Sequence, residues 1–151
     1  MQERFLASAP ISQKRLGETG VMFLSRPYSI EEVEHAVSSL PNKKSPGIDG
    51  VLAEFFKTFW PSVNNQVTDA ILECLNSGLI LKSINRTVIV LIAKTPEGKQ
   101  FSDYRPISLS TAICKIIAKV LANHLKVVLE DIVDDSQNVF IKDRSMTKGI
   151  L

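Results

Sequence analysis

The sequence predicts an α+β fold that is mostly helical and carries one β-hairpin. Apolar residues recur at helical spacing in three stretches, 30–40, 63–75 and 113–128. One β-branched apolar run, 87–93, is followed by a turn-rich segment and a second short run at 104–107, which is the pattern of two strands joined by a longer loop. Helical periodicity therefore dominates, and the strand signal is confined to one place.

Length and composition fit one globular domain. The chain has 151 residues, of which 44% are hydrophobic and 23% are charged, and this is enough to form a core. No apolar run reaches the roughly 18 residues that cross a bilayer, and the N-terminus lacks the apolar stretch of a secretory signal. We expect an intracellular protein, nuclear or cytoplasmic, without membrane contact. Residues 1–24 lack a period and are expected to be a poorly ordered lead-in to one domain over 25–151.

Cysteine and histidine do not have the spacing of metal ligands. Cys74 and Cys114 fall on apolar helical faces, and His35 and His124 stand alone on helix patterns. We interpret both cysteines as buried thiols in a reducing compartment. No metal site built from Cys or His is expected.

Three helices are predicted in the first half of the chain. Residues 29–40 begin with the capping box of Ser29 and Glu32 and end at Pro41. A short apolar helix covers 51–59, and another begins at Pro61 and ends at Ser77–Gly78. An aromatic cluster lies where these two helices meet, and such clusters are more often core than base-stacking platforms. Its members are Phe55, Phe56, Phe59 and Trp60.

The loop NKKSPGIDG, residues 42–50, carries Lys43 and Lys44 next to two glycines, a proline, a serine and an aspartate. This composition gives a turn of fixed shape. The loop is either a plain surface connection or an element that offers lysines and backbone N–H groups to a phosphate chain. The loop alone does not decide between the two interpretations.

The hairpin brings two cations together. Its first strand runs from Thr87 to Ala93 and is followed by Lys94, and its second strand carries Arg105. Folding one run onto the other places both cations at one end. There they suit a polyphosphate, because arginine binds phosphate oxygens in a bidentate way. Two solvated surface cations beside a turn are the equally weighted alternative.

A long amphipathic helix is predicted from about residue 110 to 129, with Ser108 or Ser110 as its cap. Its lysines fall on a different face from its apolar stripe, and the solvated side of the helix is the plainer interpretation of them. The stripe consists of Ile113, Ile116, Ile117, Val120, Leu121, Leu125 and Val128, and the lysines are Lys115, Lys119 and Lys126.

Positive charge is concentrated in the middle of the chain. Residues 82–126 hold eight basic and two acidic side chains, which is +6; residues 1–81 hold seven and nine, and residues 127–151 hold three and five, which is −2 each. A basic segment of this kind fits a nucleic acid backbone or a nucleotide.

An acidic cluster after residue 129 is interpreted as a solvated helix end and turn. A two-metal centre needs carboxylates gathered around ions about 3.5–4 Å apart, and no buried strand presents these side chains to such a site. The cluster consists of Glu130, Asp131, Asp134 and Asp135. The sequence stops at Leu151 in mid-pattern, which we interpret as truncation.

Taken in order, four landmarks resemble the reverse transcriptase of LINE-type retrotransposons, those without long terminal repeats. Their order and spacing fit along 21–151, and the combined match is specific although no single landmark is. The landmarks are LPNKKSPGIDGVLAEFFKTFW (40–60), NRTVIVLIAK (85–94), FSDYRPISLSTAICKIIAKVLANHLK (101–126) and QNVFIKDR (137–144).

This resemblance implies the fingers and the first part of the palm of a right-hand polymerase. Lys94 and Arg105 match positions whose cations hold the triphosphate of an incoming dNTP. Gln137 and Arg144 match a motif beside the groove for the RNA template and DNA primer. Lysines of the loop and the long helix match parts near the template, and these are Lys43, Lys44, Lys115 and Lys119.

The chain also departs from the family pattern. Ala93 replaces the usual proline, which relaxes the backbone before Lys94, and His124 replaces a frequent arginine, which removes a permanent cation from the helix. KGIL (148–151) stands where the family has a DNIL-like run. We interpret these departures as drift in a copy no longer held to function.

The largest departure concerns catalysis. The family's catalytic aspartates fall after this region, and they hold two Mg²⁺ ions that activate the primer 3′-hydroxyl and steady the pyrophosphate. We therefore expect the chain alone to bind no cofactor. Three functions remain open: a polymerase fragment that is inactive alone, a basic RNA- or DNA-binding module, and a non-functional remnant.

Overall fold

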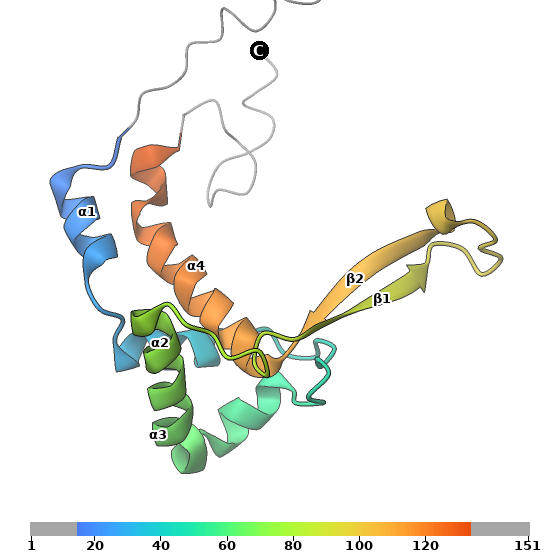
Figure 1. The fold of residues 1–151 in the computed structure, drawn as a ribbon, viewed down its shortest axis with the longest axis horizontal. Helices are drawn as coiled ribbons and strands as arrows, with labels where there is room; N and C mark the ends of the chain where they lie inside the picture. The colour runs from blue at the N-terminus through green and yellow to red at the C-terminus, as the bar shows by residue number, and fades with distance from the viewer. Residues whose placement is uncertain (1–14, 134–151) are drawn as a thin grey trace, which may run out of the picture. The chain divides into compact units, whose positions relative to one another are not determined.

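The computed structural model describes residues 15–133, and over that range it contains four α-helices, a short 3-10 turn and a two-stranded antiparallel sheet (Figure 1). The helices are α1 (Glu18–Ser25), α2 (Ile30–Ser38), α3 (Ala53–Ser77) and α4 (Ala112–Ile132), the 3-10 turn is Phe101–Asp103, and the strands are β1 (Thr87–Ala93) and β2 (Tyr104–Ser110). The predicted α+β class, mostly helical with one hairpin, is confirmed. Among the described residues, no helix combines the length and the apolar character needed to cross a membrane.

The described residues divide into two compact units, one of residues 27–124 and the other of residues 15–26 and 125–133. The second unit includes α1, a helix that the sequence did not predict, within the expected lead-in. The guanidinium of Arg26 lies 4.5 Å from the centre of the Phe23 ring, a cation–π contact just after the end of α1. The predicted domain division at residue 24 stays a prediction.

Helix α2 forms as predicted from its first residues. The backbone N–H of Ser29 donates to Oε2 of Glu32 at 3.0 Å, completing the capping box. The buried residues Val33, Ala36 and Val37 recur at helical spacing on one face. The helix ends at Ser38, shortly before the proline that follows.

Helix α3 corrects the prediction of two helices separated at Pro61. It is one helix of 25 residues with Pro61 inside, and Figure 1 shows that this helix is bent. Proline removes one hydrogen bond from the helix ladder, which favours a kink as well as a break. Here Phe56 and Ile71, on either side, enter the same core, and this shared packing holds the two halves in one helix.

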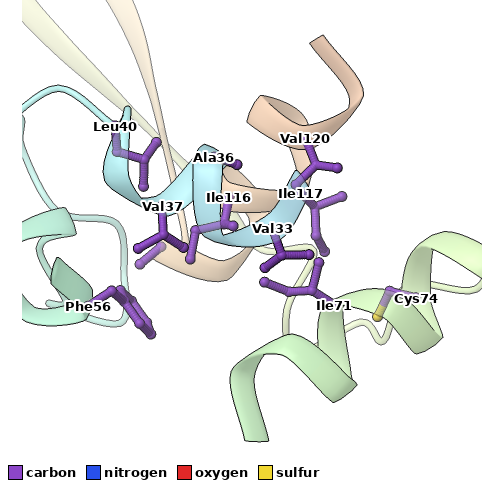
Figure 2. Close-up of a cluster of buried hydrophobic side chains, with 11 residues drawn as sticks. Val33, Ala36, Val37, Leu40, Phe56, Ile71, Cys74, Ile116, Ile117 and Val120 are labelled. Carbon is purple, nitrogen blue, oxygen red and sulfur yellow. The ribbon is translucent and has the colours of Figure 1, made fainter. Parts of the chain in front are cut away.

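The core lies where α2, α3 and α4 pack together (Figure 2). Each helix contributes buried apolar residues to this cluster: Val33, Ala36 and Val37 from α2; Phe56, Ile71 and Cys74 from α3; Ala112, Ile116, Ile117 and Val120 from α4. The predicted stripe of α4 is too wide, because Leu121 and Leu125 are 43% and 45% exposed. Periodicity identifies a face, but the width of that face depends on how many helices cover it.

Two further expectations about the core are wrong in part. Of the aromatic cluster, Phe56 is buried and Trp60 packs partly buried against the core, whereas Phe55 and Phe59 are 44% and 51% exposed. Cys74 is a buried free thiol as expected, but Cys114 is only half-buried.

The first strand of the hairpin forms over the predicted residues, and the second extends beyond the predicted 104–107 to Ser110. Strand β1 pairs with β2 from Thr87 opposite Ser110 to Ala93 opposite Tyr104. The N–H of Lys94 donates to the carbonyl oxygen of Asp103 at 2.7 Å, which makes this a hydrogen-bonded pair and, by alternation, makes the Leu91–Pro106 pair a non-hydrogen-bonded one. Pro106, which has no N–H, therefore sits where an N–H would point away from β1.

Both faces of the hairpin are apolar and exposed. Ile89 and Leu91 lie on one face at 67% and 52% exposure, while Val90 and Ile92 lie on the other at 38% and 48%. The hairpin is therefore held by its ladder and turn, with little contribution from buried side chains.

Candidate nucleotide and nucleic-acid interface

The register brings Lys94 and Arg105 onto one face of the hairpin. Arg105 pairs with Ile92, and Lys94 is two residues beyond Ile92, opposite Asp103. Successive side chains alternate between faces, so the two cations are diagonal neighbours, with Cα atoms about 7–8 Å apart. The sequence placed them at one end of the hairpin, and the structure adds that they share a face and are both exposed.

The turn beside these cations is built around Asp103. Its Oδ2 accepts the backbone N–H groups of Gln100 and Lys99, each at 2.9 Å, and these hydrogen bonds hold the pKa of the carboxyl below its ordinary value. The ammonium of Lys94 donates to the carbonyl oxygen of Ser102 at 2.6 Å. The carboxylate of Asp103 thus stabilises the turn by accepting its backbone N–H groups. Sequence analysis missed this residue, although an aspartate at a turn is a local signal.

The loop 42–50 is packed against the base of the hairpin. A Cβ on Gly47 would lie 2.2 Å from the carbonyl oxygen of Ser110, so only glycine fits this approach. Oδ2 of Asp49 accepts the N–H of Ala112 at 2.7 Å, across 63 residues of sequence. The loop is therefore a fixed part of the site and not a free surface connection.

Helix α4 begins differently from the prediction. Neither Ser108 nor Ser110 caps it, since both lie in β2. The hydroxyl of Thr111 accepts the N–H of Cys114 at 3.3 Å and donates to the carbonyl oxygen of Ile84 at 2.6 Å. One threonine thus caps the helix and ties it to the segment that enters β1.

Two of the predicted lysines, Lys44 of the loop and Lys115 of α4, come together at this junction. Nζ of Lys115 donates to the carbonyl oxygen of Ser45 at 2.8 Å, and Lys44 and Lys115 line one pocket. Lys119 follows one turn later on α4 and is half-buried. Their role in binding nucleic acid stays a prediction.

Lys43 and Glu54 shape the other end of the loop. Lys43 has a left-handed backbone conformation, with φ of +56°, and its N–H donates to Oε1 of Glu54. This backbone hydrogen bond is the main reason why the pKa of Glu54 lies below its ordinary value. Sequence analysis also missed Lys57, whose ammonium donates to the carbonyl oxygen of Leu40 and to Oδ1 of Asn42 and so secures the end of α2.

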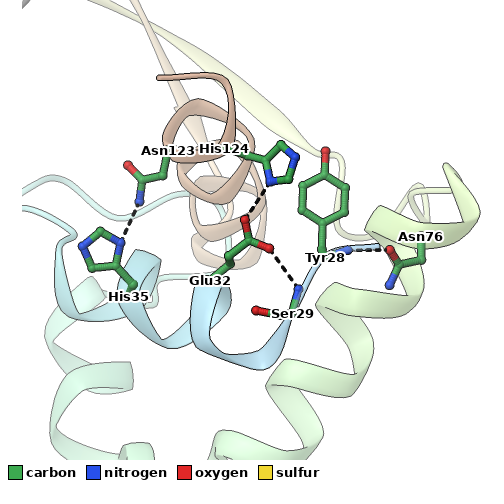
Figure 3. A network of polar contacts seen from close by, with 7 residues as sticks. All are labelled: Tyr28, Ser29, Glu32, His35, Asn76, Asn123 and His124. Carbon is green, nitrogen blue, oxygen red and sulfur yellow. Dashed lines mark hydrogen bonds and ion pairs between the residues drawn. The ribbon is translucent and has the colours of Figure 1, made fainter. Parts of the chain in front are cut away.

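A polar network joins α2 to α4 (Figure 3). His124 is 4% exposed, and its Nδ1 lies 2.6 Å from Oε1 of Glu32, whose other oxygen accepts the capping N–H of Ser29. The ring of Tyr28 lies 4.7 Å from that of His124. The departure from arginine at residue 124 therefore concerns interior packing between helices, not the surface that the lysines form.

Several predicted residues cannot be placed. Gln137 and Arg144 lie outside the described residues, as do Asp134 and Asp135 of the acidic cluster. Within residues 15–133, no group of three or more His, Cys, Asp or Glu side chains is arranged to hold a metal ion.

Comparison with known proteins finds relatives encoded by mobile elements. The chain is 30% identical over 127 residues to the transposon TX1 uncharacterized 149 kDa protein of Xenopus laevis, covering 84% of this chain and 10% of that protein. It is 28% identical over 128 residues to the probable RNA-directed DNA polymerase from transposon BS of Drosophila melanogaster, covering 83% of this chain and 14% of that protein.

A third relative is the putative 115 kDa protein in type-1 retrotransposable element R1DM of Drosophila melanogaster, 24% identical over 102 residues, which are 66% of this chain and 10% of that protein. The chain thus spans between 10% and 14% of the length of these curated relatives. No protein-family model matches it.

Proposed function

We propose that this chain, a homologue of proteins encoded by transposons and LINE-type retrotransposons, forms part of the fingers of an RNA-directed DNA polymerase. The homology rests on the three relatives, one of which is named a probable RNA-directed DNA polymerase. The observation that carries the proposal is the hairpin register, because it sets Lys94 and Arg105 on one exposed face. Two cations side by side form the simplest receptor for a triphosphate.

The two cations have different parts in this proposal. The guanidinium of Arg105 binds two phosphate oxygens at once, whereas the ammonium of Lys94 acts as a point charge with three donors. One of those donors is used by the carbonyl oxygen of Ser102, which orients the side chain before the nucleotide arrives. The hairpin thereby orients the triphosphate of a dNTP.

The RNA template and DNA primer are proposed to lie along the basic junction between the loop and α4. Phosphate contacts from lysines fix the position of a nucleic acid without reading its sequence. The side chains proposed for this role are Lys43, Lys44, Lys115 and Lys119, together with Gln137 and Arg144 beside the template–primer groove.

Phosphoryl transfer in such a polymerase depends on two Mg²⁺ ions that clamp the attacking and leaving oxygens. The described residues do not offer a donor set for them, so no chemical step is assigned to these side chains. Their proposed contribution is to bind and orient the reactants. We expect the 151-residue chain by itself to give no primer extension on an RNA template with Mg²⁺, and product formation would contradict this view.

The proposal is tested by titrating the chain with dGTP and following tryptophan fluorescence or heat. Replacing Arg105→Ala or Lys94→Ala removes a charge-assisted contact, so the affinity falls about 10- to 100-fold. Lys99→Ala removes an equal charge from the turn of the same hairpin and serves as the control, with a change expected to stay within about twofold. Equal loss in all three variants, or no loss at Arg105, would refute a specific triphosphate site.

A basic RNA- or DNA-binding module is the second candidate function, favoured by the net +6 of residues 82–126. In this case RNA binds with a logarithm of affinity that falls linearly with the logarithm of salt, while dGTP does not bind at all. The non-functional remnant remains as a third interpretation, and a cooperative thermal melt of the chain would count against it.

A further inference from the structure

A pocket lies at the junction that the predicted lysines share. Its volume is about 180 Å³, and it is bounded by the end of α2, the loop 42–50 and the first turns of α3 and α4. Leu40, Val51 and Ala112 give it an apolar lining, and Lys44 and Lys115 contribute the charged part of its wall. The two lysines are 71 residues apart in sequence, so the fold alone brings them to one cavity.

The pocket has the size and chemistry for a flat ring. A protein cavity of about 150 Å³ with apolar walls accommodates a benzene molecule, so this one has room for a single planar group. An apolar lining favours the face of such a ring over a hydrated group. Most of the lining therefore favours an apolar ring over a charged group.

Because two lysines border the pocket, we expect its ligand to carry a negative charge as well as a ring. Within residues 15–133 neither Lys44 nor Lys115 forms an ion pair. The ammonium of Lys115 uses one of its three hydrogen-bond donors for the carbonyl oxygen of Ser45, and two donors remain for a ligand. A ligand that carries a planar ring and a neighbouring negative charge matches both parts of the cavity.

The pocket is fixed in shape before any ligand arrives. The tight approach of Gly47 to Ser110 and the hydrogen bond from Ala112 to Asp49 hold the loop against the start of α4. A cavity that is already formed loses little conformational freedom on binding. Moderate affinity for one small group is therefore attainable here.

We propose that this pocket binds one unstacked base of single-stranded RNA, with an adjacent phosphate held by Lys44 and Lys115. This inference rests on the proposed function, and it adds a base-binding position to a surface otherwise assigned to phosphates. The net charge of +6 over residues 82–126 attracts any anionic ligand, an aromatic acidic peptide included. RNA is chosen over such a peptide because one relative is named a probable RNA-directed DNA polymerase. The lining offers few hydrogen-bonding groups, so the pocket accepts any base.

The test compares an RNA tetramer with a sugar–phosphate tetramer that lacks all bases, using fluorescence anisotropy over a range of salt. The unaltered chain binds the complete RNA about tenfold more tightly, since an apolar ring leaves water. Ala53→Leu places three extra carbons in the pocket and reduces this preference to within about twofold without changing the salt slope. Ala70→Leu, on the exposed side of the same helix, keeps the full preference.

Lys44 is tested separately from the base. Lys44→Ala keeps the preference for complete RNA but makes the salt slope shallower by about 0.7, the value for one phosphate contact on a single strand. Lys44→Arg restores the slope. If Ala53→Leu alters the unfolding midpoint, Leu52→Phe, at a half-exposed lining residue, provides the same filling without disturbing the core.

The outcomes separate the two proposals. Salt-dependent RNA binding that is indifferent to the bases, or to filling of the pocket, overturns the base-binding pocket and leaves the proposed function standing. Absence of any salt-dependent RNA binding overturns the proposed function itself. Tighter binding of an aspartate–phenylalanine–aspartate peptide than of RNA, lost in Ala53→Leu, assigns the pocket to a protein ligand and overturns the inference.

Discussion

The helical core and the hairpin contain similar apolar residues, which are buried in the core and exposed in the hairpin. Ile71 and Ile116 are fully buried between helices, whereas Ile89 in β1 is 67% exposed and its neighbours on both faces are also exposed. A two-stranded hairpin without a packed face is marginally stable in water. Stability therefore resides in α2, α3 and α4, and the hairpin is an element held ready by its ladder and its turn. Its apolar faces are suited to contact with something other than the helices.

The largest loss of stability is expected when a buried side chain of the helical core is truncated. Ile71→Ala removes a fully buried side chain and should lower the free energy of unfolding by about 2–5 kcal/mol. Ile89→Ala, which deletes the same atoms from the exposed hairpin, should cost less than about 1 kcal/mol. Urea unfolding followed by circular dichroism measures both, and similar losses at the two positions would show that the hairpin is packed after all.

The next effect comes from the junction between the two regions. Gly47→Ala forces a methyl group against the backbone of Ser110, and we expect a loss of about 1–3 kcal/mol because the backbone cannot move aside cheaply. Gly17→Ala, where nothing lies within 4 Å of the added carbon, should cost less than about 1 kcal/mol, the loss expected when the N-cap glycine of α1 becomes alanine. The amide of Ala112 should also exchange faster in Gly47→Ala, and unchanged exchange there would mean that the loop does not brace the hairpin.

The smallest effect is expected at the hairpin turn, when the carboxylate of Asp103 is protonated. The N–H groups of Gln100 and Lys99 hold the pKa of Asp103 below its ordinary value of 3.8. A carboxyl whose folded pKa is lowered contributes stability above its ordinary pKa and loses that contribution as the pH falls through the folded value. The turn should therefore loosen only below pH 3.8, seen as a change in the amide chemical shifts of residues 99 and 100.

A variant and a second carboxyl serve as controls for this titration. Asp103→Asn should abolish the change in those amide shifts. Glu54 should behave in the same direction through the amide of Lys43, starting from its ordinary pKa of 4.5. A transition at residues 99 and 100 above the ordinary pKa of Asp103 would contradict the assignment.

Local signals in the sequence were sufficient for much of the fold. The capping box of Ser29 and Glu32 identified the start of α2, and the β-branched run gave β1 its bounds of Thr87 and Ala93. The closeness of Lys94 to Arg105 followed from the hairpin itself, because folding the second run back onto the first brings the end of one beside the start of the other. In each case the interacting residues are close in sequence.

Interactions across long stretches of sequence could not be predicted. Asp49 reaches the start of α4 over 63 residues, and Glu32 reaches His124 over 92. Neither has a local pattern, since the partner depends on how three helices pack. At Pro61 a local signal was misleading for the same reason. Proline prefers to begin a helix, but core packing on both sides of Pro61 keeps α3 continuous.

The position of Pro106 has a consequence for self-association. An open strand edge presents N–H and C=O groups to any other extended chain, and apolar faces make such pairing more favourable. The missing N–H of Pro106 falls on the outward edge of β2, so a third strand finds its donor row interrupted there. The outward edge of β1 consists of TVIVLIA and has no proline. Any strand that extends this sheet, from another molecule or from a binding partner, is thus directed to β1.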